Sequence, residues 1–99
     1  MGETLYPWLK NTNMSVTYIL FSKSKNRFYV GSSRKDEITI RIKAHNSGKV
    51  RSTKTGRPWV EIAKEAFGSY TEARKREIFL KSGVGCNWVK KQFGFLKQS

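Results

Sequence analysis

The feature that most constrains the fold is a pair of short β-forming runs on either side of a polar, basic turn. Residues 16–21 and residues 27–31 are rich in Val, Ile, Tyr and Phe, which favour strands. Two such runs across a short turn predict a β-hairpin with one tyrosine on each strand. Because side chains alternate along a strand, Val16, Tyr18 and Leu20 are expected to share one face.

A helix is predicted directly after the hairpin. Ser32 and Ser33 are candidate N-caps, and Asp36 lies near the expected first turn. The helix is expected to end at about Asn46, where a serine and a glycine follow.

The second half of the chain predicts one strand and two further helices. Alternation in the strand places Trp59 and Ala63 on the same face. We expect a basic loop at residues 49–58, the strand at 59–67, a helix at 70–82, a hinge at 83–85 and a last helix at 87–97.

These elements predict an α+β domain with three strands and about three helices. A chain of 99 residues fits one domain with a single core. Residues 1–15 are polar at their end and have no sustained periodicity, so they are interpreted as an N-terminal leader. Residues 16–97 are the predicted domain.

The composition indicates a polyanionic partner. The chain has 20 Lys and Arg residues against 7 Asp and Glu, and its formal net charge is +13. Such a surplus is typical of proteins that bind DNA, RNA or an acidic membrane surface. A membrane is disfavoured, because the basic residues do not line one long amphipathic helix and no apolar run approaches roughly 20 residues. The alternative to polyanion binding, for most individual lysines, is that the side chain lies on the surface in contact with water.

Cysteine and histidine usage excludes several kinds of site. The one cysteine, Cys86, gives neither a disulfide framework nor a metal cluster, so a reducing, intracellular (cytoplasmic) location is expected. With one histidine, the chain cannot use a two-histidine mechanism. No Cys/His set fits zinc, and no glycine-rich phosphate loop is present.

Arg41 and His45 lie four positions apart on the predicted first helix, hence on one face. An arginine fork binds phosphate oxygens, and a neighbouring histidine offers a titratable group. This pair can therefore place a cation and a proton acceptor at the same phosphate. The alternative is a surface arginine beside a helix-capping histidine.

Glu77 follows a basic run on the predicted helix at residues 70–82. Ala73 lies one turn before it, and apolar residues surround it, so we expect the carboxylate near the sheet. A carboxylate among cations suits Mg²⁺, which often takes only one or two carboxylates plus phosphate. The alternative is a salt bridge to Lys81, four residues later.

Tyr18 and Tyr29 have an ordinary interpretation as the aromatic core of the hairpin. A tyrosine hydroxyl has a pKa near 10 and needs nearby cations or a partner base to act at neutral pH. The positive surroundings predict a lowered pKa.

Together these segments resemble the GIY-YIG nuclease superfamily, most closely its small stand-alone members. The matching segments lie within about residues 16–91. They comprise Val-Thr-Tyr-Ile-Leu, then Tyr-Val-Gly-Ser-Ser, then Arg-Ile-Lys-Ala-His-Asn-Ser-Gly, then Arg-Pro-Trp, and finally Glu-Ala-Arg-Lys-Arg-Glu-Ile-Phe-Leu-Lys-Ser. The order and joint presence of these pieces are specific, whereas any single piece is weak. The resemblance implies a small three-stranded antiparallel sheet flanked by helices.

The resemblance also implies roles for the polar residues. Tyr18 would be the general base or would position the attacking water, and His45 would assist it or hold the phosphate. Tyr29 would contact the phosphate or the water, and Arg41 would stabilise the phosphate in the transition state. Glu77 would bind the single divalent ion, Mg²⁺ or Mn²⁺.

The chain departs from the family pattern in places. The first motif is Val-Thr-Tyr in place of Gly-Ile-Tyr, although its tyrosine is retained. The stretch between Gly31 and Arg41 is slightly longer than usual. Asn87 is the candidate for the family's asparagine; alternatively, it caps the last helix.

The leading hypothesis is a metal-dependent endonuclease that hydrolyses phosphodiester bonds in DNA. The sequence leaves open whether the substrate is branched or flap DNA and whether RNA is cut instead. It also leaves open a role in DNA repair, restriction or a mobile element. The alternatives are an inactive nucleic-acid-binding module of the same fold and a basic, for example ribosome-associated, interaction protein. Substrate choice is expected from the domain surface, a homodimer or a protein partner. The expected contacts to the nucleic-acid backbone are Lys23, Lys25, Arg27, Lys49, Arg51, Lys54 and Arg57.

Overall fold

The structure is a computed structural model that describes residues 14–97. Most of the predicted leader lies outside the described residues, but Ser15, its last residue, already belongs to the first strand. The order of strands and helices confirms the predicted α+β class. In chain order the elements are β1 (Ser15–Ser22), β2 (Arg27–Ser33), α1 (Ile38–Asn46), the 3-10 helix η2 (Arg51–Gly56), β3 (Trp59–Phe67), α2 (Tyr70–Lys81), α3 (Gly83–Phe93) and the 3-10 helix η3 (Gly94–Leu96).

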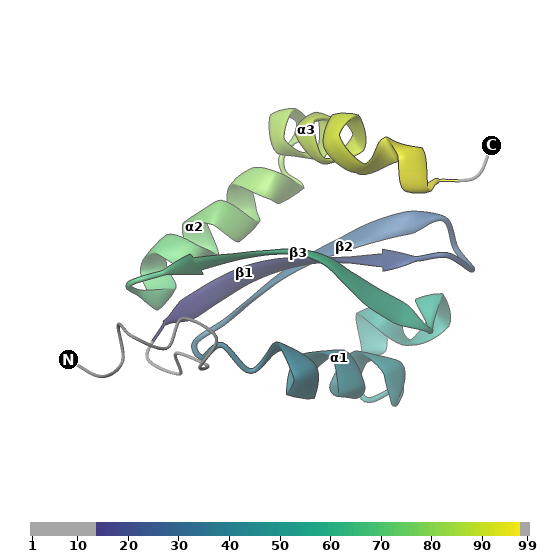
Figure 1. Ribbon diagram of the computed structural model, residues 1–99, viewed down its shortest axis with the longest axis horizontal. Helices are drawn as coiled ribbons and strands as arrows, with labels where there is room; N and C mark the ends of the chain where they lie inside the picture. Colours follow the sequence, from purple (N-terminus) through teal and green to yellow (C-terminus); the bar gives the residue numbers. More distant parts are fainter. Residues whose placement is uncertain (1–13, 98–99) are drawn as a thin grey trace, which may run out of the picture.

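The described chain forms three layers (Figure 1). Helix α1 covers one face of the sheet, and α2 and α3 cover the other face. The strand order is β2-β1-β3, and β1 pairs antiparallel with both neighbours, which confirms the expected antiparallel sheet. Strand β2 is therefore an edge strand.

The hairpin register places the two tyrosines on the same face of the sheet. Tyr18 lies opposite Gly31, and Leu20 lies opposite Tyr29. The predicted face of β1 is confirmed, since Val16, Tyr18 and Leu20 belong to one core cluster under α1. That cluster comprises Val16, Tyr18, Leu20 and Trp59, with Tyr29, Ile38 and Ile42 packed against it.

A second core cluster lies on the other face of the sheet, under α2 and α3. It comprises Ile19, Val30, Leu80 and Val89, with Phe28, Ile62, Ala63 and Phe93 packed against it. The sheet therefore buries apolar side chains on both faces, although the chain is short. All eight residues of β1 are buried as a result.

The predicted alternation in β3 is wrong because the strand contains a bulge. Ile19 pairs with Ala63, whereas the next residue, Leu20, pairs with Glu61, so Ile62 is an extra residue in the ladder. The bulge reverses the alternation. Trp59 therefore packs under α1, and Ala63 packs on the opposite face.

The predicted caps of α1 are also wrong. Ser32 and Ser33 lie in β2, which extends two residues beyond Gly31, and the helix starts after Glu37 without a side-chain cap. Asp36 accepts hydrogen bonds from Lys64 of β3, at 2.9 and 3.2 Å, and does not serve the first turn of α1. The predicted end of the helix at Asn46 is confirmed.

The predicted hinge at residues 83–85 is wrong, because these residues form the first turn of α3. Ser82 caps the helix, and its hydroxyl accepts a hydrogen bond from the Gly85 amide at 3.2 Å. A Cβ at Gly85 would collide with the Phe79 carbonyl, so glycine lets α3 start tightly against α2. Helix α2 agrees with its prediction and is capped by Ser69.

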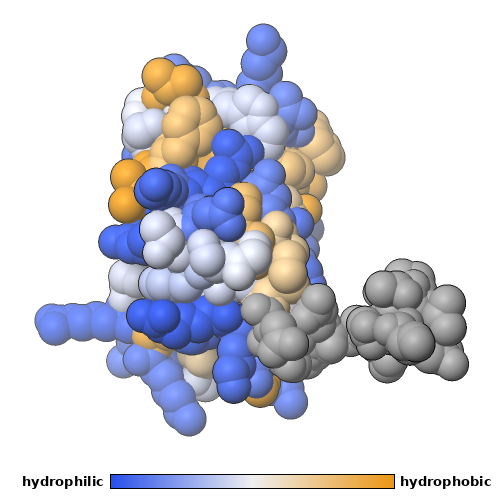
Figure 2. All heavy atoms as spheres, turned by 90° about the vertical axis from the view of Figure 1, so that its left-hand side faces the viewer, coloured by the Kyte–Doolittle hydropathy of each residue, from blue (hydrophilic) through white to orange (hydrophobic). Residues whose placement is uncertain are grey.

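Hydrophilic side chains predominate on the end of the molecule where β1 begins and β2 ends (Figure 2). Among the described residues, no helix is both long and apolar enough to cross a membrane.

Candidate active site

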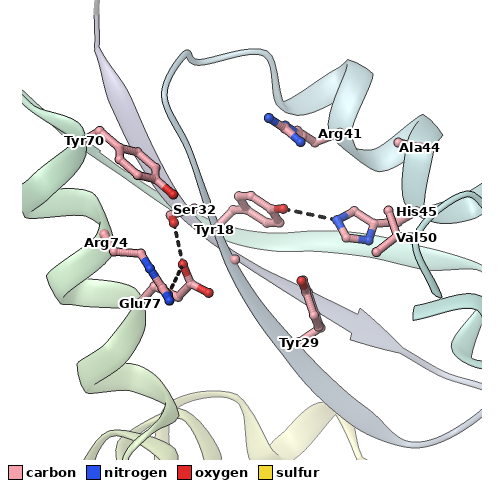
Figure 3. A pocket seen from close by; sticks show the side chains of 11 residues that line it. Tyr18, Tyr29, Ser32, Arg41, Ala44, His45, Val50, Tyr70, Arg74 and Glu77 are labelled. Atoms are coloured by element: carbon pink, nitrogen blue, oxygen red, sulfur yellow. Dashed lines mark hydrogen bonds and ion pairs between the residues drawn. The ribbon is translucent and has the colours of Figure 1, made fainter. Parts of the chain in front are cut away.

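One cavity of about 330 Å³ brings together the five residues for which catalytic roles were predicted. Tyr18 and Tyr29 reach it from the hairpin, Arg41 and His45 from α1, and Glu77 from α2 (Figure 3). These residues span much of the sequence, so the tertiary fold alone places them in one cavity. Gly31, Ser32, Ala44, Val50, Tyr70 and Arg74 complete its lining.

The cavity wraps around the edge strand β2. Figure 3 shows Arg41 and His45 approaching from α1, on one side of the strand, and Arg74 and Glu77 approaching from α2, on the other. Gly31 of β2 also lines the cavity, and a Cβ at this position would lie 2.6 Å from the hydroxyl oxygen of Tyr18. Because Gly31 has no side chain, Tyr18 can lie against the backbone of β2.

A chain of hydrogen bonds holds the Tyr18 hydroxyl. Tyr18 Oη lies 3.1 Å from His45 Nε2, and His45 Nδ1 lies 2.8 Å from Thr53 Oγ1. The Thr53 hydroxyl donates its one hydrogen to the Val50 carbonyl at 3.2 Å. With that hydrogen on the Val50 carbonyl, Thr53 Oγ1 accepts from Nδ1–H, and this is the tautomer in which Nε2 accepts from the Tyr18 hydroxyl.

The pKa values of this pair favour two neutral groups. Burial, with the neighbouring Tyr29, raises the pKa of Tyr18 to about 12 and outweighs the opposing charge of Arg41. The sequence-based expectation of a lowered pKa is wrong for this reason. Burial and the charge of Arg41 lower the pKa of His45 from 6.5. At neutral pH, His45 is therefore a neutral acceptor beside a protonated tyrosine.

Arg41 and Tyr29 flank the same pair. Arg41 Nε donates to Ser33 Oγ at 3.3 Å, and Arg41 forms no ion pair with any described acid. The Tyr29 ring packs against His45 with a centroid separation of 5.1 Å. Arg41 therefore supplies positive charge to the cavity, and no carboxylate of residues 14–97 pairs with it.

Glu77 is nearly buried, with 8% of its surface exposed, as its position after Ala73 predicted. Its carboxylate accepts a hydrogen bond from Ser32 and forms ion pairs with Arg74 at 3.0 Å and with Lys81 at 2.7 Å. Burial opposes its ionisation, but the hydrogen bonds from Lys81 and Ser32 and the charges of Lys81 and Arg74 dominate and lower its pKa. The salt bridge that the sequence offered as the alternative is thus present in the site.

Residues 14–86 match the family model of the GIY-YIG catalytic domain. The chain belongs to the GIY-YIG family. It is also 39% identical over 71 residues to the UPF0213 protein SH2523 of Staphylococcus haemolyticus (strain JCSC1435). That similarity covers 70% of this chain and 84% of the relative. No solved structure matches the chain significantly.

Membership in the GIY-YIG family gives the chain a nuclease-type catalytic domain, and nucleases of this family generally use divalent metal ions. No group of three or more His, Cys, Asp or Glu residues that could hold a metal occurs within residues 14–97. Of the acids that the structure describes, Glu77 alone offers a carboxylate to the cavity, with the Ser32 hydroxyl beside it. This donor set fits Mg²⁺, which keeps several waters and takes few carboxylates, and it fits no all-protein cage.

Two groups of predicted residues lie outside this cavity. Asn87 is exposed in the middle of α3 and is not among the cavity residues, and Ser82 rather than Asn87 caps that helix. The predicted backbone contacts are all exposed around the hairpin turn and η2, where the Ser24 hydroxyl donates to the Arg57 carbonyl at 3.2 Å. These residues are Lys23, Lys25, Arg27, Lys49, Arg51, Lys54 and Arg57.

The sequence analysis missed three residues that organise the candidate site. Thr53 fixes the histidine ring, Ser32 donates to Glu77, and Arg74 neutralises it. Arg74 could have been found from its position three residues before Glu77 on one helix. Thr53 lies in a segment predicted as a loop, and no local pattern indicates that its buried hydroxyl would face His45.

Proposed function

We propose that this chain is an endonuclease that hydrolyses phosphodiester bonds in DNA with a divalent cation, Mg²⁺ or Mn²⁺. The observation that supports the proposal is the convergence of Tyr18, Tyr29, Arg41, His45 and Glu77 in one cavity. General acid–base groups, a phosphate-binding cation and a metal-binding carboxylate are the functional groups that this hydrolysis needs. An arrangement for structural purposes alone has no need to leave them around an open cavity.

In the proposed reaction, Tyr18 and His45 activate the attacking water together. A tyrosine with a pKa of about 12 is not a phenolate at neutral pH, so it cannot act as a base alone. The Tyr18 oxygen accepts a proton from water while its own proton passes to His45 Nε2, 3.1 Å away. The resulting imidazolium keeps its Nδ1 hydrogen bond to Thr53.

Arg41 and Tyr29 act on the phosphate in this proposal. Arg41 binds the nonbridging oxygens as negative charge builds in the transition state, because its guanidinium has no ion-pair partner among the described acids. The Tyr29 hydroxyl faces the same cavity and donates to a phosphate oxygen or to the water.

Glu77 holds the divalent cation in this proposal, with Ser32 at its side. When bound, the cation neutralises charge on the phosphate and on the leaving oxygen. Lys81 and Arg74 occupy the Glu77 oxygens in the structure. If a metal were held at Glu77, at least one of these side chains would be released to pair with a substrate phosphate.

The ion pairs of Glu77 also favour a second candidate function. A carboxylate satisfied by two cations and a hydroxyl serves equally well in a non-catalytic, nucleic-acid-binding module of the same fold. Such a module binds nucleic acid without any need for the metal. Salt-sensitive binding is common to both functions and does not separate them.

Cleavage of a labelled panel of substrates separates the two candidates. The panel contains duplex, flap, fork and single-stranded DNA and a single-stranded RNA, each with Mg²⁺, Mn²⁺ or chelator. The proposal expects cutting of at least one DNA substrate that requires the metal. Binding of the panel without cutting of any member supports the non-catalytic module.

A further inference from the structure

A second cavity of about 280 Å³ adjoins the active site at the end of the molecule where β2 ends and α1 and α2 begin. It shares Ser32, Arg41 and Tyr70 with the active-site cavity, so the two cavities are neighbours. Its remaining lining residues are Ser33, Arg34, Lys35 and Glu37. The seven basic residues predicted to contact the nucleic-acid backbone lie at the opposite end of the sheet, near the hairpin turn.

The second cavity carries a positive charge. Arg34, Lys35 and Arg41 line it, against the one carboxylate of Glu37. The nearby Asp36 is already paired with Lys64 at 2.9 Å. Figure 2 views this end of the molecule, where hydrophilic side chains predominate. An anion is therefore the expected occupant, and an apolar ligand is not.

Two of the three cations of this cavity, Arg34 and Arg41, are held in place before any ligand arrives. The Arg34 guanidinium stacks over the Tyr70 ring at 4.4 Å, and the Arg34 carbonyl accepts a hydrogen bond from Ser15 at 2.9 Å. Arg41 Nε is held by Ser33 at 3.3 Å. Prior ordering of long side chains lowers the entropic cost of binding a ligand.

We propose that the second cavity binds the phosphodiester next to the scissile one in the same nucleic-acid strand. Arg41 lines both cavities, so an anion held in the second lies directly beside a phosphate held in the first. Neighbouring phosphates of one strand meet this requirement. The inference rests on the proposed function, and it adds that the strand leaves the active site past Arg34 and Lys35.

The test measures binding to DNA oligonucleotides in chelator, so that no cleavage takes place. The wild-type chain is compared with the double variant Arg34→Gln/Lys35→Gln, whose shorter side chains remain polar. The double variant Lys90→Gln/Lys91→Gln removes the same charge from the exposed surface of α3 and serves as the matched control. The binding constant is measured at several salt concentrations. Each lost phosphate contact lowers the magnitude of the slope of log K against log salt concentration by about 0.7–0.9.

A second arm replaces one phosphate at a time by a neutral methylphosphonate. At one internal position, which lies next to the cut site if the chain cuts, the wild-type chain is expected to lose about fivefold in affinity, the size expected for two partly exposed ion pairs. The Arg34/Lys35 variant is expected to have a lower salt slope and to lose nothing further at that position. The Lys90/Lys91 variant is expected to respond to the neutral linkage as the wild type does.

Three outcomes overturn the subsite. The neutral linkage costs the Arg34/Lys35 variant as much as the wild type, or the Lys90/Lys91 variant shows the same insensitivity. In the third outcome, affinity falls when a terminal 5′ phosphate is removed but does not fall at any internal neutral linkage. That result would assign the cavity to the ends of strands. Binding with the expected pattern but without cutting when metal is added overturns the proposed nuclease and leaves the subsite standing.

Discussion

Tyr18 Oη and His45 Nε2 lie 3.1 Å apart, buried between the sheet and α1, and the Thr53 hydroxyl on the far side of the ring makes Nε2 the acceptor. This relationship decides how the site can act. Burial removes phenolate chemistry from Tyr18 and keeps His45 neutral. The tyrosine therefore depends on the histidine as its proton acceptor.

The pH dependence of cleavage follows from this pair. His45 accepts a proton only when it is neutral, which is the dominant form above its pKa, so activity is lost as the pH falls through that value. Since burial and Arg41 lower the pKa of His45, the acidic limb of kcat/KM is expected below pH 6.5. His45 is the one histidine of the chain, so an NMR titration of its ring gives the pKa directly. A ring pKa at or above 6.5 contradicts this interpretation.

Replacement of Thr53 by Val tests whether the threonine sets the histidine tautomer. Valine has the same shape but leaves the Nδ1 hydrogen without an acceptor, so the ring shifts away from the Nδ1-protonated form. We expect about a tenfold loss of cleavage, as for other histidines that lose an orienting partner. Ring ¹⁵N shifts of His45 report the tautomer whether or not the chain cleaves DNA. Thr53→Ser keeps the hydroxyl and is the matched control; unchanged ¹⁵N shifts in Thr53→Val exclude the assigned role.

Replacement of Gly31 by Ala is expected to displace the Tyr18 ring. The new Cβ would lie 2.6 Å from Tyr18 Oη, and Tyr18 is packed with 3% of its surface exposed. The expected loss of stability is about 1–3 kcal/mol, with a larger proportional loss of activity. Gly94→Ala is the control, because a Cβ at Gly94 meets nothing within 4 Å. Thermal unfolding and cleavage rates measure the two effects, and equal behaviour of the two variants refutes the prediction.

Lys81 is expected to compete with a divalent cation for Glu77. Its ammonium group lies 2.7 Å from Glu77 Oε2, where a metal would bind. Lys81→Met is therefore expected to tighten Mn²⁺ binding in the absence of DNA, by about fivefold for a partly exposed ion pair. Electron paramagnetic resonance of bound Mn²⁺ measures this affinity, with Lys75→Met, an exposed lysine on the same helix, as the control. Weaker or unchanged binding in Lys81→Met argues against the competition.

Local patterns were sufficient to predict most of the fold. The hairpin and β3 follow from β-forming runs and turn residues, and the bounds of α2 follow from helical periodicity, each of which acts within a few residues. The errors arise where packing between distant segments decides. The bulge at Ile62 and the start of α3 at Gly83 depend on contacts with β1 and α2, which no local pattern records.

Part of the candidate site was predictable from the sequence, but its arrangement was not. Arg41, His45 and Glu77 were found from helical spacing and from the family resemblance, and all three line the cavity. The wrapping of the cavity around β2 depends on β2 being an edge strand, which only the tertiary fold reveals. The raised pKa of Tyr18 was missed because sequence shows the surrounding charges and does not show burial.

The most direct test of the central claim compares cleavage and binding by the wild type, Tyr18→Phe and Glu77→Gln on the best substrate of the panel, with Mg²⁺ or Mn²⁺. The account predicts metal-dependent cutting by the wild type, a loss of about 10²–10⁴ in Tyr18→Phe and a loss on the order of a thousandfold in Glu77→Gln. Both variants are expected to bind DNA nearly as tightly as the wild type. Undiminished cutting by Tyr18→Phe or Glu77→Gln, or a wild type that binds every substrate and cuts none, contradicts it.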